Sequence, residues 1–284
     1  MMSDIIEKKR YRVLLSSDIH CTDLVLWYGW QNEDRLERWL SFVNREHERD
    51  PFDLILLLGD YSLDFWMDGG SWLDKGHSDA AKFMNRYASR LPKDVPLVVI
   101  PGNHEQYSDS EWVEITGNHR QESIVLGDCV FVLLDNFKTL EEVGHRNDGI
   151  YKPLDADYVR HAAAENPDKN IFLLAHYFNT EADGDVIRSL EAECGRIIGL
   201  FQGHTHRNTV IHENGVAIAE TGNYSYTSME DKVSTFWGVR DLVIENGHAV
   251  SRYIIDENRA SLDGTDTQIP RQICETMEYD LRIK

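Results

Sequence analysis

Five short polar clusters punctuate the chain, and each directly follows a run of apolar residues. In chain order they contain Asp18 and His20, Asp60, Asn103 and His104, His176, and His204 and His206. The apolar runs before them are rich in β-branched residues, which is typical of buried strands. In an open α/β sheet, reactive groups collect where strands end in loops. The sequence therefore predicts that the five clusters converge on one site.

The side chains of these clusters form a particular donor set, in which carboxylates and imidazoles are joined by one amide oxygen. An all-oxygen cage would suit Mg²⁺ or Ca²⁺. Mixed oxygen and nitrogen donors instead suit borderline divalent metals. The clusters therefore predict a transition-metal site.

The order of the clusters resembles the signature of the calcineurin-like metallophosphoesterases. That signature runs Asp-x-His, Gly-Asp, Gly-Asn-His-(Asp/Glu), His, and Gly-His-x-His, and every element occurs here between residues 18 and 206. The resemblance implies an α/β fold, a four-layer αββα sandwich of two mixed β-sheets flanked by helices. It also implies a metal-dependent phosphoric ester hydrolase.

The resemblance further implies that seven side chains bind two metal ions. The first ion would be held by Asp18, His20, Asp60 and His206, and the second by Asp60, Asn103, His176 and His204. Asp60 would bridge the ions, because a carboxylate can bind one ion with each oxygen. Two ions about 3.5–4 Å apart acidify a shared water and offset charge on the attacking and leaving oxygens. The expected metals are Mn, Fe or Zn, which tolerate these ligands.

His104 is the residue expected to be catalytic without binding metal. By resemblance, a metal-bridging hydroxide attacks the phosphorus, while His104 protonates the leaving oxygen or stabilises the phosphoryl group. Histidine titrates near neutral pH, so either role is feasible. The alternative is a structural histidine in a tight Gly-Asn turn. Glu105 either orients a ring or is a plain surface glutamate.

Two subfamilies fit the sequence poorly. Serine/threonine phosphatases carry Gly-Asp-x-x-Asp-Arg-Gly, but here Leu63 replaces the second Asp, Asp64 comes one place late and the Arg is absent. Purple acid phosphatases carry a Tyr where Leu63 stands, and they lack a histidine at the place of His20. The sequence looks most like the small bacterial phosphodiesterase and phosphohydrolase branch.

Aromatic residues are frequent after the motifs. They are Trp27, Tyr28, Trp30, Trp66, Trp72, Trp112, Tyr224 and Tyr226. Such rings either form a wall at the site mouth, where they would stack on bases or cover apolar leaving groups, or pack a cap made by the loops. The first alternative predicts a small diester or a nucleotide-like ester as substrate. Among the histidines outside the motifs, His77 and His119 are the best candidates for substrate contact.

Composition limits the partners. The chain has 284 residues, of which 42% are hydrophobic, and a formal net charge of −20. This charge disfavours long nucleic acid, whose binding relies on Lys and Arg. No apolar stretch approaches the ~18 residues of a membrane helix, and the charged N-terminus shows no signal peptide. Cys21, Cys129, Cys194 and Cys274 are widely spaced, which predicts free thiols in a reducing, cytoplasmic compartment.

Hydrophobic periodicity predicts strands and helices that alternate, followed by a β-rich C-terminal third. Strands are expected at residues 11–17, 52–58, 97–100, 123–126, 129–134, 171–175, 196–201, 209–212, 216–220, 236–244 and 248–255. Helices are expected at residues 32–48, 78–91, 155–166 and 183–193. We expect one metallophosphoesterase domain over residues 1–256, and a C-terminal extension over 257–284 that is a surface tail or one short element.

Two other functions remain open at this point. One is a nuclease of the same superfamily, which the acidic balance and the lack of a basic stripe disfavour. The other is a non-catalytic metal-binding scaffold, against which the intact His104 and the full ligand set argue. The favoured function is hydrolysis of a small phosphodiester or phosphomonoester, with no membrane partner.

Overall fold

Two six-stranded β-sheets form the centre of the molecule, which is a computed structural model that describes residues 10–68, 71–72, 78–225, 237–256 and 276–282. The first sheet has the order β16-β15-β14-β1-β4-β7. Its strands are β1 (Arg10–Ser16), β4 (Leu54–Leu58), β7 (Leu97–Ile100), β14 (Gly238–Glu245), β15 (His248–Ile255) and β16 (Met277–Asp280). Strands β1, β4 and β7 run parallel, and β14, β15 and β16 join them as antiparallel neighbours.

The second sheet has the order β12-β13-β11-β10-β9-β8. Its strands are β8 (Glu122–Leu126), β9 (Cys129–Leu134), β10 (Asn170–Ala175), β11 (Ile197–Gln202), β12 (Val210–Glu213) and β13 (Val216–Glu220). The four inner strands are parallel, whereas β8 and β12 pair antiparallel at the two edges.

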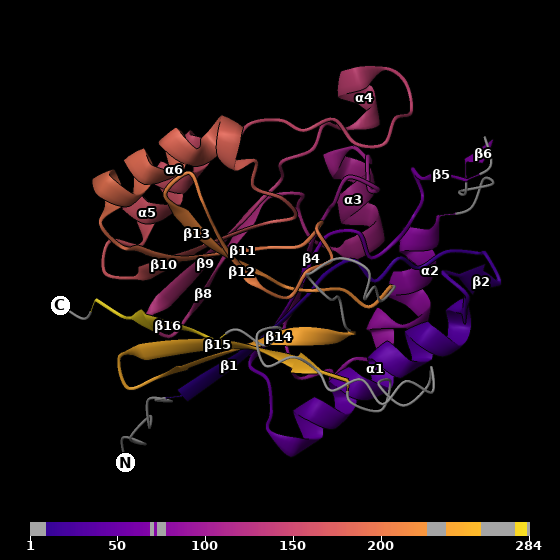
Figure 1. The fold of residues 1–284 in the computed structure, drawn as a ribbon, viewed down its shortest axis with the longest axis horizontal. Coiled ribbons are helices and arrows are strands. Elements are labelled where there is room, and N and C mark those ends of the chain that lie inside the picture. Colours follow the sequence, from indigo (N-terminus) through magenta and orange to yellow (C-terminus); the bar gives the residue numbers. More distant parts are fainter. Residues whose placement is uncertain (1–9, 69–70, 73–77, 226–236, 257–275, 283–284) are drawn as a thin grey trace, which may run out of the picture.

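Helices cover the outer face of each sheet, which gives four layers (Figure 1). The first sheet is covered by α1 (Asn32–Arg49), α2 (Asp79–Arg86) and α3 (Asp109–Thr116). The second is covered by α5 (Ala156–Glu165) and α6 (Thr180–Cys194). The predicted αββα sandwich of two mixed sheets is therefore confirmed.

Strand alternation explains why the sheets pack face to face. On β1, Val13 and Leu15 point into the core between the sheets, while Leu14 points into the core under α1. Phe131 and Phe172 meet Val13 and Leu15 in that inner core from the second sheet. Successive strand side chains point to opposite faces, so a strand that is apolar throughout must be covered on both sides.

Several small elements were not expected from periodicity. They are α3, the short helix α4 (Leu140–Val143), and the two-stranded ribbons formed by β2 (Leu26–Trp27) with β3 (Trp30–Gln31) and by β5 (Met67–Asp68) with β6 (Ser71–Trp72). The helix expected at residues 78–91 is shorter, because α2 ends at Arg86 and a 3₁₀ turn, η1 (Ala88–Arg90), follows it.

The C-terminal extension contributes one strand within its described residues, since β16 pairs with β15 at the edge of the first sheet. The division at residue 256 stays a prediction. Cys21, Cys129 and Cys194 are free thiols, as expected, and Cys274 lies outside the described residues. In the described part of the chain, no helix has both the length and the apolar character needed to cross a membrane.

Candidate metal centre

The five polar clusters lie at the C-terminal ends of five strands. Asp18 and His20 follow β1, Asp60 follows β4, and Asn103 and His104 follow β7. From the second sheet, His176 follows β10, and His204 and His206 follow β11. Strands β1, β4 and β7 are parallel, as are β10 and β11, so their carboxyl ends share an edge in each sheet. The face-to-face packing brings the two edges together, and the predicted convergence is found.

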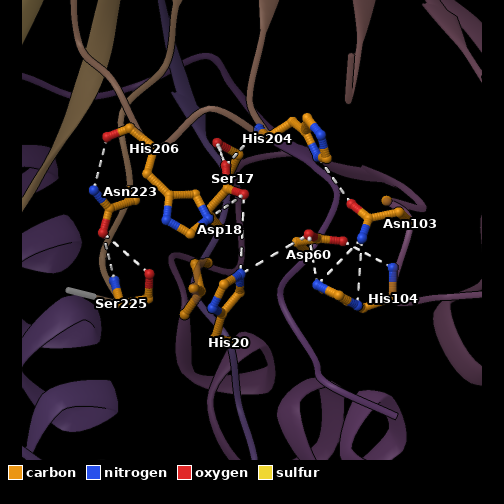
Figure 2. Close-up of polar contacts among 12 residues, drawn as sticks. Ser17, Asp18, His20, Asp60, Asn103, His104, His204, His206, Asn223 and Ser225 are labelled. Atoms are coloured by element: carbon orange, nitrogen blue, oxygen red, sulfur yellow. Dashed lines mark hydrogen bonds and ion pairs between the residues drawn. The ribbon is translucent and has the colours of Figure 1, made fainter. Parts of the chain in front are cut away.

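One group of side chains gathers around Asp18. Its Oδ1 lies 3.2 Å from His206 Nε2 and 3.9 Å from His20 Nε2. The same His20 Nε2 lies 3.9 Å from Asp60 Oδ2, so His20 stands between the two carboxylates (Figure 2).

A second group gathers around Asp60. Its Oδ2 lies 3.1 Å from His176 Nε2. Asn103 Oδ1 lies 3.1 Å from His176 Nε2 and 2.9 Å from His204 Nδ1. Asp60 therefore touches side chains of both groups, which is the position that a bridging ligand needs.

The polar atoms of these groups are arranged more like ligands of two cations than like hydrogen-bond partners of one another. Within the residues that the structure describes, Asp18 Oδ1 and both ring nitrogens of His20 are buried and accept or donate no hydrogen bond. Buried polar groups are costly when they have no partner. In each group, Asp18–His20–His206 and Asp60–His176–His204, three donor atoms lie within 4.8 Å of one another, as ligands of one ion do. The same is true of His20, Asp60 and His104.

The pKa shifts of the imidazoles also favour binding of cations. Burial lowers the pKa of His20 well below its ordinary value, and burial with repulsion from His176 lowers the pKa of His204 to about 4. For His176, burial favours the neutral ring, but attraction to Asp60 outweighs it and raises the pKa to about 9. Metal ions and protons compete for the same nitrogen. A cation beside Asp60 would take the place of that proton.

Hydrogen bonding sets the orientation of His176. Its Nδ1 lies 2.7 Å from the carbonyl oxygen of Leu58 and must donate to it, because a carbonyl only accepts. The Nε2 lone pair of the neutral ring is thereby directed at Asp60 and Asn103. Metal-binding histidines commonly use their second nitrogen in this way.

The loops that carry the clusters have unusual backbone conformations. Five predicted ligands adopt a left-handed backbone, with φ of 51° at Asp18, 55° at His20, 52° at Asp60, 66° at His204 and 61° at His206. Residues other than glycine avoid this region, and each such residue costs about 1–3 kcal/mol. Strain concentrated on one set of side chains is typical of a functional site.

Two motif glycines allow the loops to approach closely. A Cβ on Gly59 would lie 2.6 Å from the backbone of Gly102 and 2.7 Å from His176 Nδ1. A Cβ on Gly102 would collide with the carboxylate of Asp60. The glycines of Gly-Asp and Gly-Asn-His therefore create space for the ligands beside them.

Glu105 has neither of its two expected roles, which were to orient a ring or to lie on the surface. It is fully buried, and its two oxygens accept hydrogen bonds from the backbone N–H groups of Asp60, Ser62 and Gly102 and from the Ser62 hydroxyl, at 2.7–2.9 Å. Burial and repulsion from Asp60 raise its pKa to about 8. Glu105 is neither a surface residue nor the orienter of a ring, because it ties the loop after β4 to the loop after β7.

Arg35 plays a similar part under the first cluster, and the motif pattern missed it. This buried side chain on α1 donates to the carbonyl oxygens of Ile19, His20 and Tyr224 and to the side chain of Asn32. The bonds to His20 and Tyr224 are 2.7 Å and 2.6 Å long. One signal was available in the sequence, since Arg35 lies within the buried stripe of α1, four residues before Trp39.

Ser17 and Asn223 complete this support. The Ser17 hydroxyl donates to Asp18 Oδ2 at 2.5 Å, and the backbone N–H of His204 donates to the same oxygen at 2.9 Å. Asn223 Nδ2 donates to the carbonyl oxygen of His206 at 2.9 Å (Figure 2). Asp18 is thus fixed through one oxygen, which leaves the other facing the histidines.

His104 lies next to Asp60, on the wall of a cavity. Its Nε2 lies 3.5 Å from Asp60 Oδ2, and its backbone N–H donates to Asp60 Oδ1 at 3.1 Å. Its ring meets Trp66 edge to face, with centroids 5.0 Å apart, and its Nδ1 lies 3.7 Å from Asp148 Oδ1. The ring lines a cavity of about 170 Å³ that also contains Asp60 and Asn103. This location is compatible with contact to a substrate.

The aromatic residues divide between the cavity and the core. Trp27, Tyr28 and Trp66 line the cavity, together with Leu63 and Asp148. Four other rings do not: Trp112 and Tyr224 are fully buried, Trp30 packs on Trp237, and Trp72 lies over Arg146. Tyr226 lies outside the described residues. Some of the rings therefore line the cavity, as the first alternative requires, and others belong to the core; contact of the cavity rings with a substrate stays a prediction.

The two departures from the phosphatase motifs have structural explanations. Leu63 packs against Trp27 beside the cavity. Asp64 is buried and accepts from the backbone N–H groups of Asp79 and Ala80, at 2.6 Å and 2.9 Å, so it caps the start of α2. Asp64 therefore does not replace the missing motif carboxylate at the site.

Two further features lie away from the site. His119 pairs with Asp109 at 3.1 Å on the surface and does not line the cavity, while His77 lies outside the described residues. A larger groove of about 570 Å³ runs along α1, between Trp30 and Trp237, and contains none of the predicted ligands. The smaller cavity is the one that is lined by predicted ligands.

Comparison with known proteins identifies the family. The family model of the calcineurin-like phosphoesterases matches the sequence over residues 11–208, which contain all five clusters. The chain belongs to the calcineurin-like phosphoesterase family. A search among curated proteins gives no match. The family and the Asp and His groups together fit a metal-dependent phosphoesterase.

Solved structures match the chain at low sequence identity. GAP50, the anchor in the inner membrane complex of Plasmodium, is 11% identical with a TM-score of 0.57, over 98% of this chain and 90% of its own. Vps29 with Zn²⁺ from Entamoeba histolytica is 14% identical (TM-score 0.44), over 94% of this chain and 98% of its own. A putative 5'-nucleotidase from Staphylococcus aureus is 15% identical (TM-score 0.43), over 96% of this chain and 54% of its own.

Proposed function

We propose that this member of the family is a binuclear metal-dependent phosphoesterase that hydrolyses a small phosphodiester or phosphomonoester in the cytoplasm. One observation carries the proposal: Asp60 contacts both groups of candidate ligands, and His104 lies 3.5 Å from it without being one of the seven proposed ligands, although a donor atom of His104 also lies within 4.8 Å of those of His20 and Asp60. A site that only stored metal would not need this additional imidazole beside the bridging carboxylate.

The proposed ligands divide as the groups do. Asp18, His20, Asp60 and His206 would hold one ion, and Asp60, Asn103, His176 and His204 would hold the other. Two bound ions would lower the pKa of a coordinated water to near 7, and they would place positive charge beside the phosphoryl oxygens. Mn, Fe and Zn ions suit the donor set. Asn103 contributes a neutral oxygen, which limits negative charge beside an anionic substrate.

The remaining steps belong to the chain's own side chains. The loops fixed by Arg35 and Glu105 hold the ligands, so that little reorganisation is needed during the reaction. His104 gives a proton to the leaving oxygen, or stabilises the phosphoryl group, from its place on the cavity wall. Trp27 and Trp66 exclude water from one side and cover the organic part of the ester.

The substrate class follows from the net charge and the size of the cavity. A formal charge of −20 repels long polyanions, and a cavity of about 170 Å³ admits a small ester group. A nucleotide-like ester fits this description, because a base could stack on an aromatic wall. Phosphoproteins and duplex DNA are expected to be poor substrates.

The test compares the protein stripped of metal by chelation with the protein reloaded with Mn²⁺, Fe²⁺ or Zn²⁺. Cyclic nucleotides, aryl monoesters and diesters, a phosphopeptide and plasmid DNA serve as substrates. We expect metal-dependent turnover, fastest for a small ester. Full activity without metal would overturn the proposal, and fastest turnover of the phosphopeptide or the DNA would overturn the substrate class. Metal binding without any turnover would favour a scaffold.

A further inference from the structure

The wall of the cavity around His104 has two different flanks. On one side the ring of Trp66 meets the imidazole edge to face, with centroids 5.0 Å apart. On the other, Asp148 Oδ1 approaches His104 Nδ1 to 3.7 Å. A leaving group that takes a proton from His104 must therefore lie between an aromatic ring and a carboxylate.

Asp148 is available to a ligand as well as to His104. Its side chain is 69% exposed, although it lines the same cavity as His104 and Trp66. Among the described residues that line the cavity, Asp148 is the only charged side chain besides the proposed ligand Asp60, and neither Lys nor Arg occurs. The leaving-group side of the cavity therefore has negative charge and aromatic surface.

Aromatic faces with a nearby carboxylate form a recognised environment for organic cations. A cation over an exposed ring gains about 0.5–1 kcal/mol, and the ring of Trp is the best partner. The exposed Tyr28, whose ring lies 4.9 Å from that of Trp27, extends this aromatic surface toward the solvent. An anionic leaving group would meet repulsion from Asp148 and gain nothing from the rings.

We propose that Asp148 and Trp66 form a subsite for the leaving alcohol, and that the preferred alcohol carries an ammonium group. This inference rests on the proposed function and adds the chemistry of one side of the ester. The loop of Asp148 is held close to the site, because Asn103 Nδ2 donates to the carbonyl oxygen of Asp148 at 3.3 Å and a Cβ on Gly149 would collide with Asn103. The backbone of this loop is therefore held beside the ligand Asn103.

The experiment uses three methyl phosphodiesters that differ only in the second alcohol, because a phenyl group would leave in preference to that alcohol. The alcohols are choline, its uncharged isostere with carbon in place of nitrogen, and a hydroxy acid of similar length. Release of each alcohol by the metal-loaded protein gives kcat/KM. We expect kcat/KM for the choline ester to exceed that for the isostere ester by roughly two- to fivefold, which is the usual contribution of an exposed ion pair. The hydroxy acid ester should have the lowest kcat/KM.

Variants assign the preference to residues. Asp148→Asn keeps the shape of the side chain, and it should reduce the choline advantage and accelerate the hydroxy acid ester. Trp66→Leu should lower kcat/KM for the choline ester by roughly two- to fivefold relative to kcat/KM for the isostere ester. The matched control is Asp128→Asn, which removes the same charge from an exposed residue before β9, at the opposite end of the sheet, and should leave all three rates unchanged.

The outcomes separate this inference from the proposed function. Metal-dependent hydrolysis at equal rates for choline and its isostere would overturn the subsite alone. An unchanged rate ratio in Asp148→Asn would do the same. If none of the three esters is hydrolysed by a metal-loaded sample that turns over an aryl phosphomonoester, only the subsite is wrong. If the aryl monoester is not hydrolysed either, the proposed function is wrong as well.

Discussion

The floor and the mouth of the candidate site are built differently. The floor, Ser17, Arg35 and Glu105, is fully buried and holds the ligand loops through hydrogen bonds at 2.5–2.9 Å. The mouth, Tyr28, Trp66 and Asp148, is partly or largely exposed. A buried network must be complete to be stable, whereas an exposed rim can vary. The floor is therefore expected to control metal binding, and the mouth the choice of substrate.

The largest effect should follow a change at the shared ligand. Asp60→Asn replaces a carboxylate that touches both groups by a neutral amide, which bridges two cations poorly. Stabilisation of charge by metal is worth several kcal/mol, so kcat/KM should fall by about 10³-fold or more. Metal analysis should show that at least one ion is weakened. Retention of both ions and of activity would remove Asp60 from the centre of the site.

His104 is expected to separate chemistry from metal binding. His104→Ala should retain both ions but turn over roughly 10²–10⁴-fold more slowly, which is the usual contribution of general acid catalysis. The loss should shrink for leaving groups that need no proton. Metal content and rates on a series of aryl esters test this. An equal loss across the series would assign His104 an electrostatic role instead.

Arg35 tests whether the floor supports the ligands. Arg35→Lys keeps the charge but cannot donate to the carbonyl oxygens of Ile19, His20 and Tyr224 together. Loss of such outer support typically weakens metal binding by about 10–100-fold. The matched control is Arg45→Lys, on the half-exposed side of the same helix. Equal metal affinity in the two variants would show that the floor supports only the fold.

The floor and the mouth also differ in how far the sequence predicts them. The proposed ligands could be found in the sequence because each follows an apolar strand, and the convergence of these strand ends was predicted. The sandwich followed from alternating periods and from strands that are apolar on both faces. Glu105 was identified as a motif residue but given the wrong place, because sequence spacing does not show which backbone N–H groups a carboxylate will meet.

The mouth could be predicted only in part, for physical reasons. Asp148 comes 44 residues after His104 in a loop with no periodic pattern, so only the tertiary fold brings it within 3.7 Å. The aromatic residues after each motif look alike in sequence, yet Trp66 lines the cavity and Trp112 is buried under the first sheet. Burial of a ring depends on what packs over its loop.

Asp79 should affect stability without affecting catalysis. Burial and repulsion from Asp64 raise its pKa to about 8, above the value of about 3.9 for an unfolded chain. Its contribution to stability is complete below about pH 4 and is lost as the pH rises through about 8. Asp79→Asn should therefore increase the free energy of unfolding, relative to the natural chain, by about 1 kcal/mol or more at alkaline pH. Denaturant unfolding at several pH values measures this, and a constant difference would refute the assigned cause.

Tyr28 should show the smallest effect and define the outer limit of the site. It forms the turn between β2 and β3 with Gly29, and both residues have left-handed backbones, with φ of 48° and 80°. Tyr28→Asn removes the ring but keeps the turn, because Asn-Gly is the favoured pair for it. Metal affinity should not change, and stability should stay within about 0.5 kcal/mol, as for most surface substitutions. KM for esters with an aromatic or cationic alcohol should rise by roughly two- to fivefold, with kcat unchanged. A fall in kcat or a loss of metal would place Tyr28 with the floor and break the division between the two regions.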